Sequence, residues 1–240
     1  WSMKQRAGKK KVVLELGGNA GVIIEPDADI HLAAKKTAFG AFVYSGQVCI
    51  SVQRVYIHSS KFDNFLEKLI QETKSYKTGN PLDEIVTFGP MIDRKNAERI
   101  ESWVDQAVKN GAKIITGGHR DGTYYAPTIL TKVDSKLPVA CNEAFGPILI
   151  INSYTDFDDA IKEVNNTDFG LQAGIFTNQM DKILKAFNEL DVGGVMINDI
   201  PTFRVDNMPY GGVKDSGFGR EGIKYSMQEM TEIKLLVYNH

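Results

Sequence analysis

One cysteine of the chain lies in a turn of small and polar residues, Tyr44-Ser-Gly-Gln-Val-Cys49-Ile-Ser51. A substrate can reach a thiol in such a turn, and free backbone N–H groups beside it can stabilise an oxyanion, by about 3 to 4 kcal/mol per donor. A cysteine is more often only a small apolar residue, and Cys141 fits that description. Cys49 is therefore the candidate nucleophile.

A carboxylate upstream of this thiol is the second group with possible chemistry. Glu15 ends an apolar run, Val12-Val-Leu-Glu15-Leu-Gly17-Gly18, in which a buried charge is costly. Strand alternation alone favours a solvent-facing Glu15 with no special role. With a candidate nucleophile in the same chain, a carboxylate placed in a cleft could instead act as a general base.

A glycine-rich match near the end of the chain is misleading. Gly217-Phe-Gly219-Arg-Glu-Gly222 has the G-x-G-x-x-G spacing of dinucleotide-binding loops. No predicted strand precedes it, and the acidic residue expected ~20 positions later has no room to follow. We interpret the segment as a loop that shapes a pocket wall.

Composition excludes several classes of function. The 240 residues carry 28 basic and 30 acidic side chains, for a formal net charge of −2, so no nucleic acid or anionic membrane is expected as partner. No apolar run approaches the ~18 residues that cross a bilayer. The two cysteines and four histidines lack zinc-site or disulfide spacing, so we expect no metal. Reduced thiols favour a cytoplasmic protein.

Alternating strand and helix patterns must position these groups. Apolar residues at helical spacing predict helices that begin near residues 26, 59, 93, 156 and 180. Short apolar or β-branched runs predict strands at 12–16, 22–24, 54–58, 113–116, 124–130, 147–152, 172–176 and 195–198. This alternation predicts an α/β fold with a mostly parallel sheet and helices on both faces.

Four separated segments resemble the signature motifs of the NAD(P)-dependent aldehyde dehydrogenase superfamily. They are Leu14-Glu-Leu-Gly-Gly18, Gly46-Gln-Val-Cys49, Glu143-Ala-Phe-Gly-Pro147 and Pro209-Tyr-Gly-Gly-Val-Lys-Asp-Ser-Gly217. They occur in the family's order and span most of residues 12 to 222. The resemblance implies the catalytic-domain fold of that family and the oxidation of an aldehyde to a carboxylic acid.

The resemblance also implies roles for residues. Cys49 would be the nucleophile that forms a thiohemiacetal and then a thioester, and Glu15 the base that activates water. Glu143 would hold the nicotinamide ribose of NAD or NADP, with Gly17 also in the coenzyme site, and Phe145 would contact the nicotinamide. This glutamate is often absent in relatives that pass the acyl group to coenzyme A, so Glu15 favours the hydrolytic branch.

A substrate pocket follows from the same resemblance. It assigns Val48, Ile50, Arg204 and Tyr210 to the pocket, with Arg204 in the loop that lines the aldehyde entrance. A solvated surface arginine is an equally good interpretation of Arg204. If Arg204 binds substrate, we expect a small polar or anionic aldehyde of the lactaldehyde, glyceraldehyde or semialdehyde type.

The chain is shorter than the family pattern. Family chains are about twice this length, and the half that would precede Trp1 supplies the coenzyme-binding fold and an oxyanion-hole asparagine. We therefore expect residues 1–11 to be the end of a coenzyme-domain helix and a linker, 12–222 the catalytic domain, and 223–240 a C-terminal helix and oligomerisation strand. The isolated chain should fold, bind NAD or NADP poorly and be inactive, and the whole enzyme should be a homodimer or homotetramer.

Two other classes stay open at this point. A cysteine hydrolase acting on thioesters or amides would need a histidine beside Cys49, and His31, His58 and His119 are the candidates. A non-catalytic oligomerisation module would need neither Glu15 nor Cys49 in a shared cleft.

Overall fold

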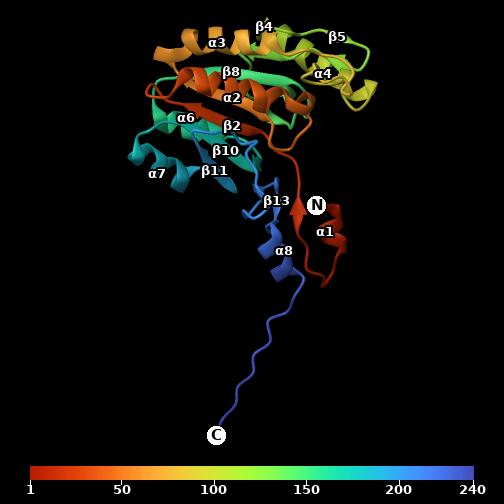
Figure 1. Cartoon of the computed structure of the whole chain (residues 1–240), viewed down its shortest axis with the longest axis vertical. Helices are drawn as coiled ribbons and strands as arrows, with labels where there is room; N and C mark the ends of the chain where they lie inside the picture. Colours follow the sequence, from red (N-terminus) through yellow and green to blue (C-terminus); the bar gives the residue numbers. More distant parts are fainter.

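A seven-stranded sheet forms the centre of the computed structural model, which describes all residues from Trp1 to His240 (Figure 1). The strand order is β11-β10-β2-β3-β8-β7-β4, and every neighbouring pair is parallel except β4 with β7. The strands are β2 (Ala20–Ile24), β3 (Val52–His58), β4 (Lys113–Thr116), β7 (Thr128–Thr131), β8 (Ile148–Tyr154), β10 (Gln172–Phe176) and β11 (Gly194–Ile197).

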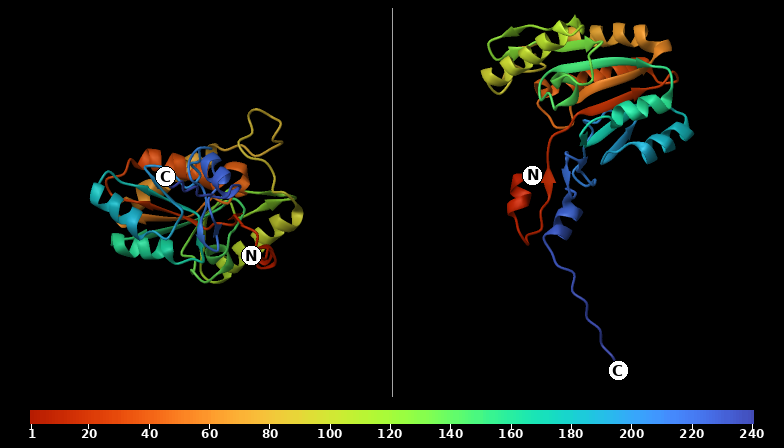
Figure 2. Two further views of the ribbon diagram at one scale, coloured as in Figure 1. Left: turned by 90° about the horizontal axis from the view of Figure 1, so that it is seen from below. Right: turned by 180° about the vertical axis from the view of Figure 1, so that it is seen from behind.

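Helices cover both faces of this sheet (Figure 2), which confirms the predicted fold class. Helices α2 and α3 pack on one face, and α4 to α7 pack on the other. Their bounds are α2 (Ile30–Phe42), α3 (Phe62–Ser75), α4 (Arg94–Lys109), α5 (Pro138–Cys141), α6 (Phe157–Asn165) and α7 (Met180–Glu189). No helix is both long enough and apolar enough to span a membrane.

Alternation within β2 shows why the strands are apolar throughout. Val22 and Ile24 enter the core under α2 and α3, whereas Ile23 points to the core under α6 and α7. All three side chains are fully buried. Because full burial of such a side chain stabilises the fold by about 1.5 to 3 kcal/mol, a strand covered on both faces is apolar at most of its positions.

Helix α2 leads directly to the turn that carries Cys49. Asp29 accepts a hydrogen bond from the backbone N–H of Leu32 at 3.0 Å and so caps the first turn. Such a cap stabilises a helix by about 1 kcal/mol. Small residues let the helix lie close to its neighbours, and a Cβ at Gly40 would come 2.6 Å from the side chain of Ile200.

Three antiparallel ribbons lie outside the main sheet. They pair β1 (Leu14–Glu15) with β13 (Gly217–Phe218), β9 (Phe169–Gly170) with β12 (Val213–Lys214), and β5 (Arg120–Asp121) with β6 (Tyr124–Tyr125). The strand predicted at 12–16 therefore forms with a partner that sequence reasoning did not assign to it. The strand predicted at 124–130 is interrupted at Pro127, which has no N–H to donate to a sheet.

The two ends of the chain lie away from the sheet. Helix α1 (Ser2–Arg6) precedes β1, and helix α8 (Ile223–Glu229) follows the glycine-rich block. Residues 231–240 have no regular structure, are exposed and extend away from the core (Figure 1). The predicted C-terminal strand has no partner in a single chain, and its pairing with another copy stays a prediction.

Candidate active site

The turn that carries Cys49 leaves α2 through three successive residues in the left-handed region. The φ angle is 51° at Tyr44, 58° at Ser45 and 67° at Gly46, within a short 3-10 segment, η1 (Val43–Gly46). A non-glycine residue in this region costs about 1 to 2 kcal/mol. A Cβ at Gly46 would lie 2.1 Å from the carbonyl oxygen of Gly146. Only glycine allows the turn to pack this closely.

The thiol of Cys49 lies 3.1 Å from the hydroxyl oxygen of Tyr210. The same hydroxyl donates a hydrogen bond to Oε1 of Glu15 at 3.4 Å. Burial first, and then the carboxylate of Glu15, raise the pKa of Cys49 to about 12, against a lowering contribution from Tyr210. The fold therefore brings both predicted groups, the nucleophile and the base, to one hydroxyl, and the thiol is protonated at neutral pH.

The glycine-rich block holds Glu15 in this position. Glu15 pairs with Gly217 in the ribbon of β1 and β13, and Leu16 N donates to the carbonyl of Ser216 at 3.1 Å. A Cβ at Gly217 would lie 2.1 Å from the carbonyl oxygen of Leu14. The close approach of the two backbones explains this glycine and turns Glu15 toward the thiol.

The backbone beside the thiol has a free donor. The N–H of Cys49 donates to no acceptor within the chain, whereas the N–H of Ser51 donates to the carbonyl of Val48 at 2.9 Å. A free N–H next to a nucleophilic sulfur can donate to an oxygen that becomes negatively charged during addition.

A second carboxylate approaches the double glycine that follows Glu15. Gly18 N donates to Oε1 of Glu143 at 2.9 Å. A Cβ at Gly17 would lie 2.6 Å from Oε2 of Glu143, so a side chain at position 17 would displace the carboxylate. Burial, in the first place, raises the pKa of Glu143, while the Gly18 N–H lowers it and Glu15 raises it.

Two buried amides that sequence reasoning missed fix the segment before Glu143. Asn19 donates to the carbonyls of Ala140 and Asn142 at 2.9 and 3.0 Å. Gln53 donates to the carbonyl of Asn142 at 2.8 Å and accepts from Ala144 N at 3.0 Å. A signal exists in the sequence, because both are amides at buried positions at the start of apolar strands, where a polar group needs partners.

Phe145 lies beside this carboxylate with an unusual backbone. Its φ is 45°, and its side chain is 41% exposed. Arg99 donates to the carbonyl of Ala144 at 2.7 Å and so fixes the preceding peptide. The backbone before Phe145 is therefore fixed, and the aromatic ring is exposed at the surface.

The predicted substrate-pocket residues lie together around the thiol. Ile50 and Tyr210 are 5% and 2% exposed and pack with Leu171, and Val48 lies against the same cluster. The guanidinium of Arg204 lies 4.3 Å from the centre of the Tyr210 ring. Because Ile50 and Tyr210 are almost fully buried, they form the wall behind Cys49.

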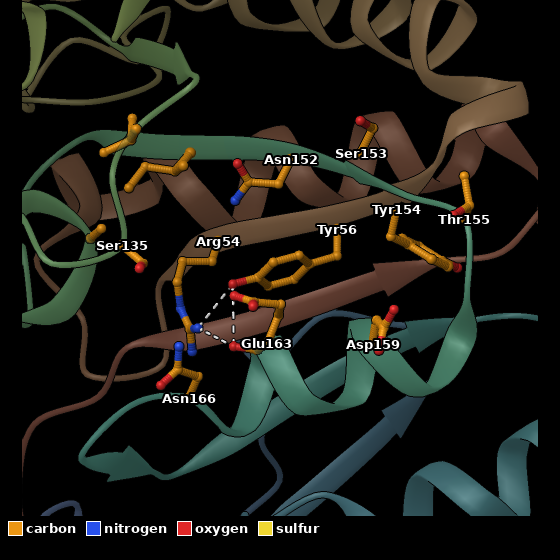
Figure 3. Close-up of a pocket in the computed structure, with 13 residues that line it drawn as sticks. Arg54, Tyr56, Ser135, Asn152, Ser153, Tyr154, Thr155, Asp159, Glu163 and Asn166 are labelled. Carbon is orange, nitrogen blue, oxygen red and sulfur yellow. Dashed lines mark hydrogen bonds between the residues drawn. The ribbon is translucent and has the colours of Figure 1, made fainter. Parts of the chain in front are cut away.

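A polar hollow of about 440 Å³ lies elsewhere on the molecule (Figure 3). It is bordered by residues of β3, β8 and α6, and none of the predicted site residues lines it. Its buried arginine, Arg54, donates to the carbonyls of Glu163 and Val164 at 2.8 and 3.0 Å. These contacts cap the C-terminal end of α6, so we interpret Arg54 as a structural residue.

The histidines do not meet the thiol. His31 and His119 are exposed, and His58 contacts Ser60 at 2.8 Å. None of the three is a hydrogen-bond partner of Cys49, whose side-chain partner is Tyr210. The arrangement required for a cysteine hydrolase is therefore not formed.

The structure combines a mostly parallel α/β sheet with a half-buried thiol, a hydroxyl and two carboxylates near the amino ends of its central strands, and so defines an α/β protein with a candidate cysteine nucleophile. The family model of the aldehyde dehydrogenase family matches residues 2–236. The chain belongs to the aldehyde dehydrogenase family, as its four motifs predict.

Three known proteins show how far the similarity extends. The chain is 49% identical over 237 residues to 3-sulfolactaldehyde dehydrogenase of Priestia megaterium, covering 99% of this chain and 50% of the relative. It is 44% identical to lactaldehyde dehydrogenase of Methanococcus aeolicus, with 99% and 51% covered. The crystal structure of glyceraldehyde-3-phosphate dehydrogenase GapN from Methanocaldococcus jannaschii, complexed with NADP, superimposes with a TM-score of 0.93 at 44% identity, covering 97% of this chain and 51% of that one. The chain thus spans about half the length of the relatives it matches.

Proposed function

We propose that this chain is the catalytic part of an NAD(P)-dependent aldehyde dehydrogenase that releases a carboxylic acid. The observation that carries the proposal is the Tyr210 hydroxyl, which lies 3.1 Å from Cys49 Sγ and 3.4 Å from Glu15 Oε1. A thiol nucleophile and a carboxylate base within reach of one atom suit a reaction with an addition step and a hydrolysis step.

Cys49 carries out the addition step, and Glu15 assists the hydrolysis step. Cys49 adds to the aldehyde carbon and forms a thiohemiacetal, whose oxyanion accepts a hydrogen bond from the Cys49 N–H. Loss of hydride from this adduct leaves a thioester on Cys49. Glu15 then takes a proton from a water molecule, which attacks the thioester and releases the acid and the thiol.

The residues at the double glycine fit a nicotinamide coenzyme, which supplies the hydride acceptor. The two oxygens of Glu143 can accept from the hydroxyls of a ribose, and the absence of a Cβ at Gly17 leaves room for this carboxylate. The exposed ring of Phe145 offers an apolar surface to a planar group. NAD and NADP are both compatible with these residues.

The substrate we propose is a small 2-hydroxyaldehyde with a polar or anionic group. Lactaldehyde, 3-sulfolactaldehyde and glyceraldehyde 3-phosphate, in the names of the relatives, share this skeleton. Arg204 supports the proposal, because it stacks on the Tyr210 ring and its partner Glu221, at 3.3 Å, is partly exposed. Exposed ion pairs contribute only about 0 to 1 kcal/mol, so a substrate anion can replace Glu221.

An arginine substitution tests the substrate class. In the natural protein, Arg204→Leu should raise KM for anionic 2-hydroxyaldehydes about tenfold or more and leave KM for propanal unchanged, because only the anion uses the guanidinium. Arg94→Leu is the matched control, since Arg94 is also exposed and paired, with Glu98 on α4. An equal rise in KM for both aldehydes would contradict the role of Arg204.

The coenzyme-binding half is a further part of the proposal. We propose that residues 1–11 link residues 12–222 to a preceding coenzyme domain. If so, the isolated 240-residue chain should bind NAD and NADP only weakly. Calorimetric titration of the isolated chain measures this directly, and a micromolar dissociation constant for either coenzyme would contradict it.

Residues 231–240 are proposed to pair with a second copy in a homodimer or homotetramer. Their apolar side chains are exposed, including Ile233 at 103% and Leu236 at 88%. Deletion of residues 230–240 should lower the sedimentation mass of the natural protein.

The free thiols of Cys49 and Cys141 support a cytoplasmic location.

A further inference from the structure

The hydroxyl of Tyr210 occupies a position for which a pocket wall has no need. It is the atom that contacts both Cys49 Sγ and Glu15 Oε1, at 3.1 and 3.4 Å. A phenylalanine ring would fill the same apolar cluster without this group. The role of the hydroxyl must therefore lie in its contacts with Cys49 and Glu15.

The chain holds this hydroxyl firmly. Tyr210 N donates to the carbonyl of Glu221 at 3.0 Å, and Glu221 N donates back at 2.6 Å. The ring is 2% exposed and packs against Ile50 and Leu171, and the guanidinium of Arg204 lies over it at 4.3 Å. Backbone pairing and ring contacts thus fix the direction in which the hydroxyl points.

We propose that Tyr210 is a catalytic residue that passes the thiol proton of Cys49 to Glu15 when the sulfur attacks. The S–H bond of Cys49 breaks as a new O–H bond forms on Tyr210. The original O–H bond of Tyr210 breaks as Glu15 Oε1 takes its proton. Cys49 becomes a thiolate, Glu15 becomes a neutral acid and Tyr210 ends with its hydroxyl intact. Glu15 then releases this proton to solvent and regains the carboxylate that takes a proton from water in the hydrolysis step.

The protonation states of the thiol and of the hydroxyl are compatible with such a transfer. With a pKa of about 12, the Cys49 thiol is protonated at neutral pH and must lose its proton before it can attack. Burial, and then the Cys49 thiol, raise the pKa of Tyr210, which keeps its oxygen protonated. A neutral hydroxyl can accept from the thiol and donate to the carboxylate at the same time. The inference rests on the proposed function for its place in the reaction, because it concerns the same nucleophile and base.

Alkylation of Cys49 tests the relay without aldehyde or coenzyme. The probe is iodoacetamide, applied between pH 6 and 9 to the natural protein with Cys141→Ser, and adducts at Cys49 are counted by mass spectrometry. Tyr210→Phe should slow alkylation about tenfold or more, because the thiolate loses a charge-assisted hydrogen bond and the proton loses its route. Tyr125→Phe is the matched control, since Tyr125 is 1% exposed but packs in the separate core under α4. An unchanged alkylation rate in Tyr210→Phe would overturn the proposal.

The direction in which Glu15→Gln changes the alkylation rate distinguishes a proton relay from a simple charge effect. If Glu15 receives the proton through Tyr210, Glu15→Gln should slow alkylation, and it should slow it no further in the Tyr210→Phe background. If Glu15 acts only as a negative charge that raises the thiol pKa, Glu15→Gln should speed alkylation, and the proposal is overturned. This variant keeps Tyr210 in place, so its result does not depend on whether Tyr210→Phe folds.

Failure of the relay and failure of the dehydrogenase assignment give different results. A protein that oxidises no aldehyde but shows both alkylation effects would reject the proposed function and keep the relay. A protein that oxidises aldehydes, with Tyr210→Phe raising only KM and leaving alkylation unchanged, would keep the function and reduce Tyr210 to a pocket wall.

Discussion

Carboxylates lie at both ends of the central strands, and their surroundings differ: Glu25 is buried, whereas Glu15 and Glu143 are half-buried. Glu25 follows the carboxyl end of β2, is 1% exposed, and is bound by Lys182 and the hydroxyl of Tyr154. Glu15 and Glu143 precede the amino ends of β2 and β8, and neither forms an ion pair. Their hydrogen bonds come from one tyrosine hydroxyl and one backbone N–H.

The difference separates structure from chemistry. A buried charge that is fully paired is held in one ionisation state and cannot exchange protons readily. A half-buried carboxylate with one weak partner keeps oxygens free for water, a hydroxyl or a proton. We therefore expect substitutions of Glu15 and Glu143, near the amino ends of the strands, to change activity, and substitutions of Glu25 to change stability.

The largest expected effect is the loss of the nucleophile. Cys49→Ala should lower aldehyde oxidation by several orders of magnitude, because no other group at the site can form the thioester. The melting temperature should stay within about 2 °C, since the thiol is only half-buried. A single-turnover assay of coenzyme reduction measures the effect, with Cys141→Ser as the control that should remain active.

The next largest effect concerns the base. Glu15→Gln should lower the steady-state rate roughly 100-fold or more, in line with the usual contribution of a general base. Because Glu15 also receives the thiol proton, both the first turnover and the later hydrolysis of the thioester should slow, and a single-turnover measurement of coenzyme reduction separates the two effects. A variant with the steady-state rate of the native enzyme would rule out Glu15 as the base.

Glu25 should give the opposite pattern. Glu25→Gln leaves Lys182 without its partner and should lower the free energy of unfolding by about 2 to 4 kcal/mol. Urea unfolding measures this change, and kcat at 25 °C should stay within about twofold. Glu232→Gln is the matched control, because Glu232 pairs with Lys11 at 3.1 Å where both are exposed, and it should cost under about 1 kcal/mol. A large fall in kcat with unchanged stability would break the comparison.

The smallest effect is a gain in stability at Glu143. Because burial raises the pKa of this carboxyl, the folded chain binds its proton more tightly than the unfolded chain does. Its contribution to stability therefore falls as the pH rises from its unfolded pKa through its folded pKa. Glu143→Gln should remove this loss. The melting temperature of the variant should therefore be slightly above that of the native chain at pH 7 but not at pH 4. The KM for the coenzyme should rise. A lower melting temperature at pH 7 would contradict the assignment.

The sequence by itself determined the fold class and singled out Cys49 and Glu15 as the candidate reactive groups. Apolar runs such as β10 and helical spacing such as that of α4 depend on local burial, which neighbouring residues report directly. Its four motifs also indicated the family. They placed Cys49 and Glu15 in one site, although no local pattern said how the two side chains meet.

The tertiary structure alone decided which groups touch. The pairing of β1 with β13 joins residues about 200 positions apart, and the spacing of residues along the chain carries no record of such long-range contacts. The same reason explains why Tyr210 was predicted as a substrate-pocket residue and not as the partner of Cys49. The amide contacts of Asn19 and Gln53 were also missed: an amide at the start of an apolar strand indicates that it needs partners, but only the tertiary structure shows that these are the backbone carbonyls near Asn142.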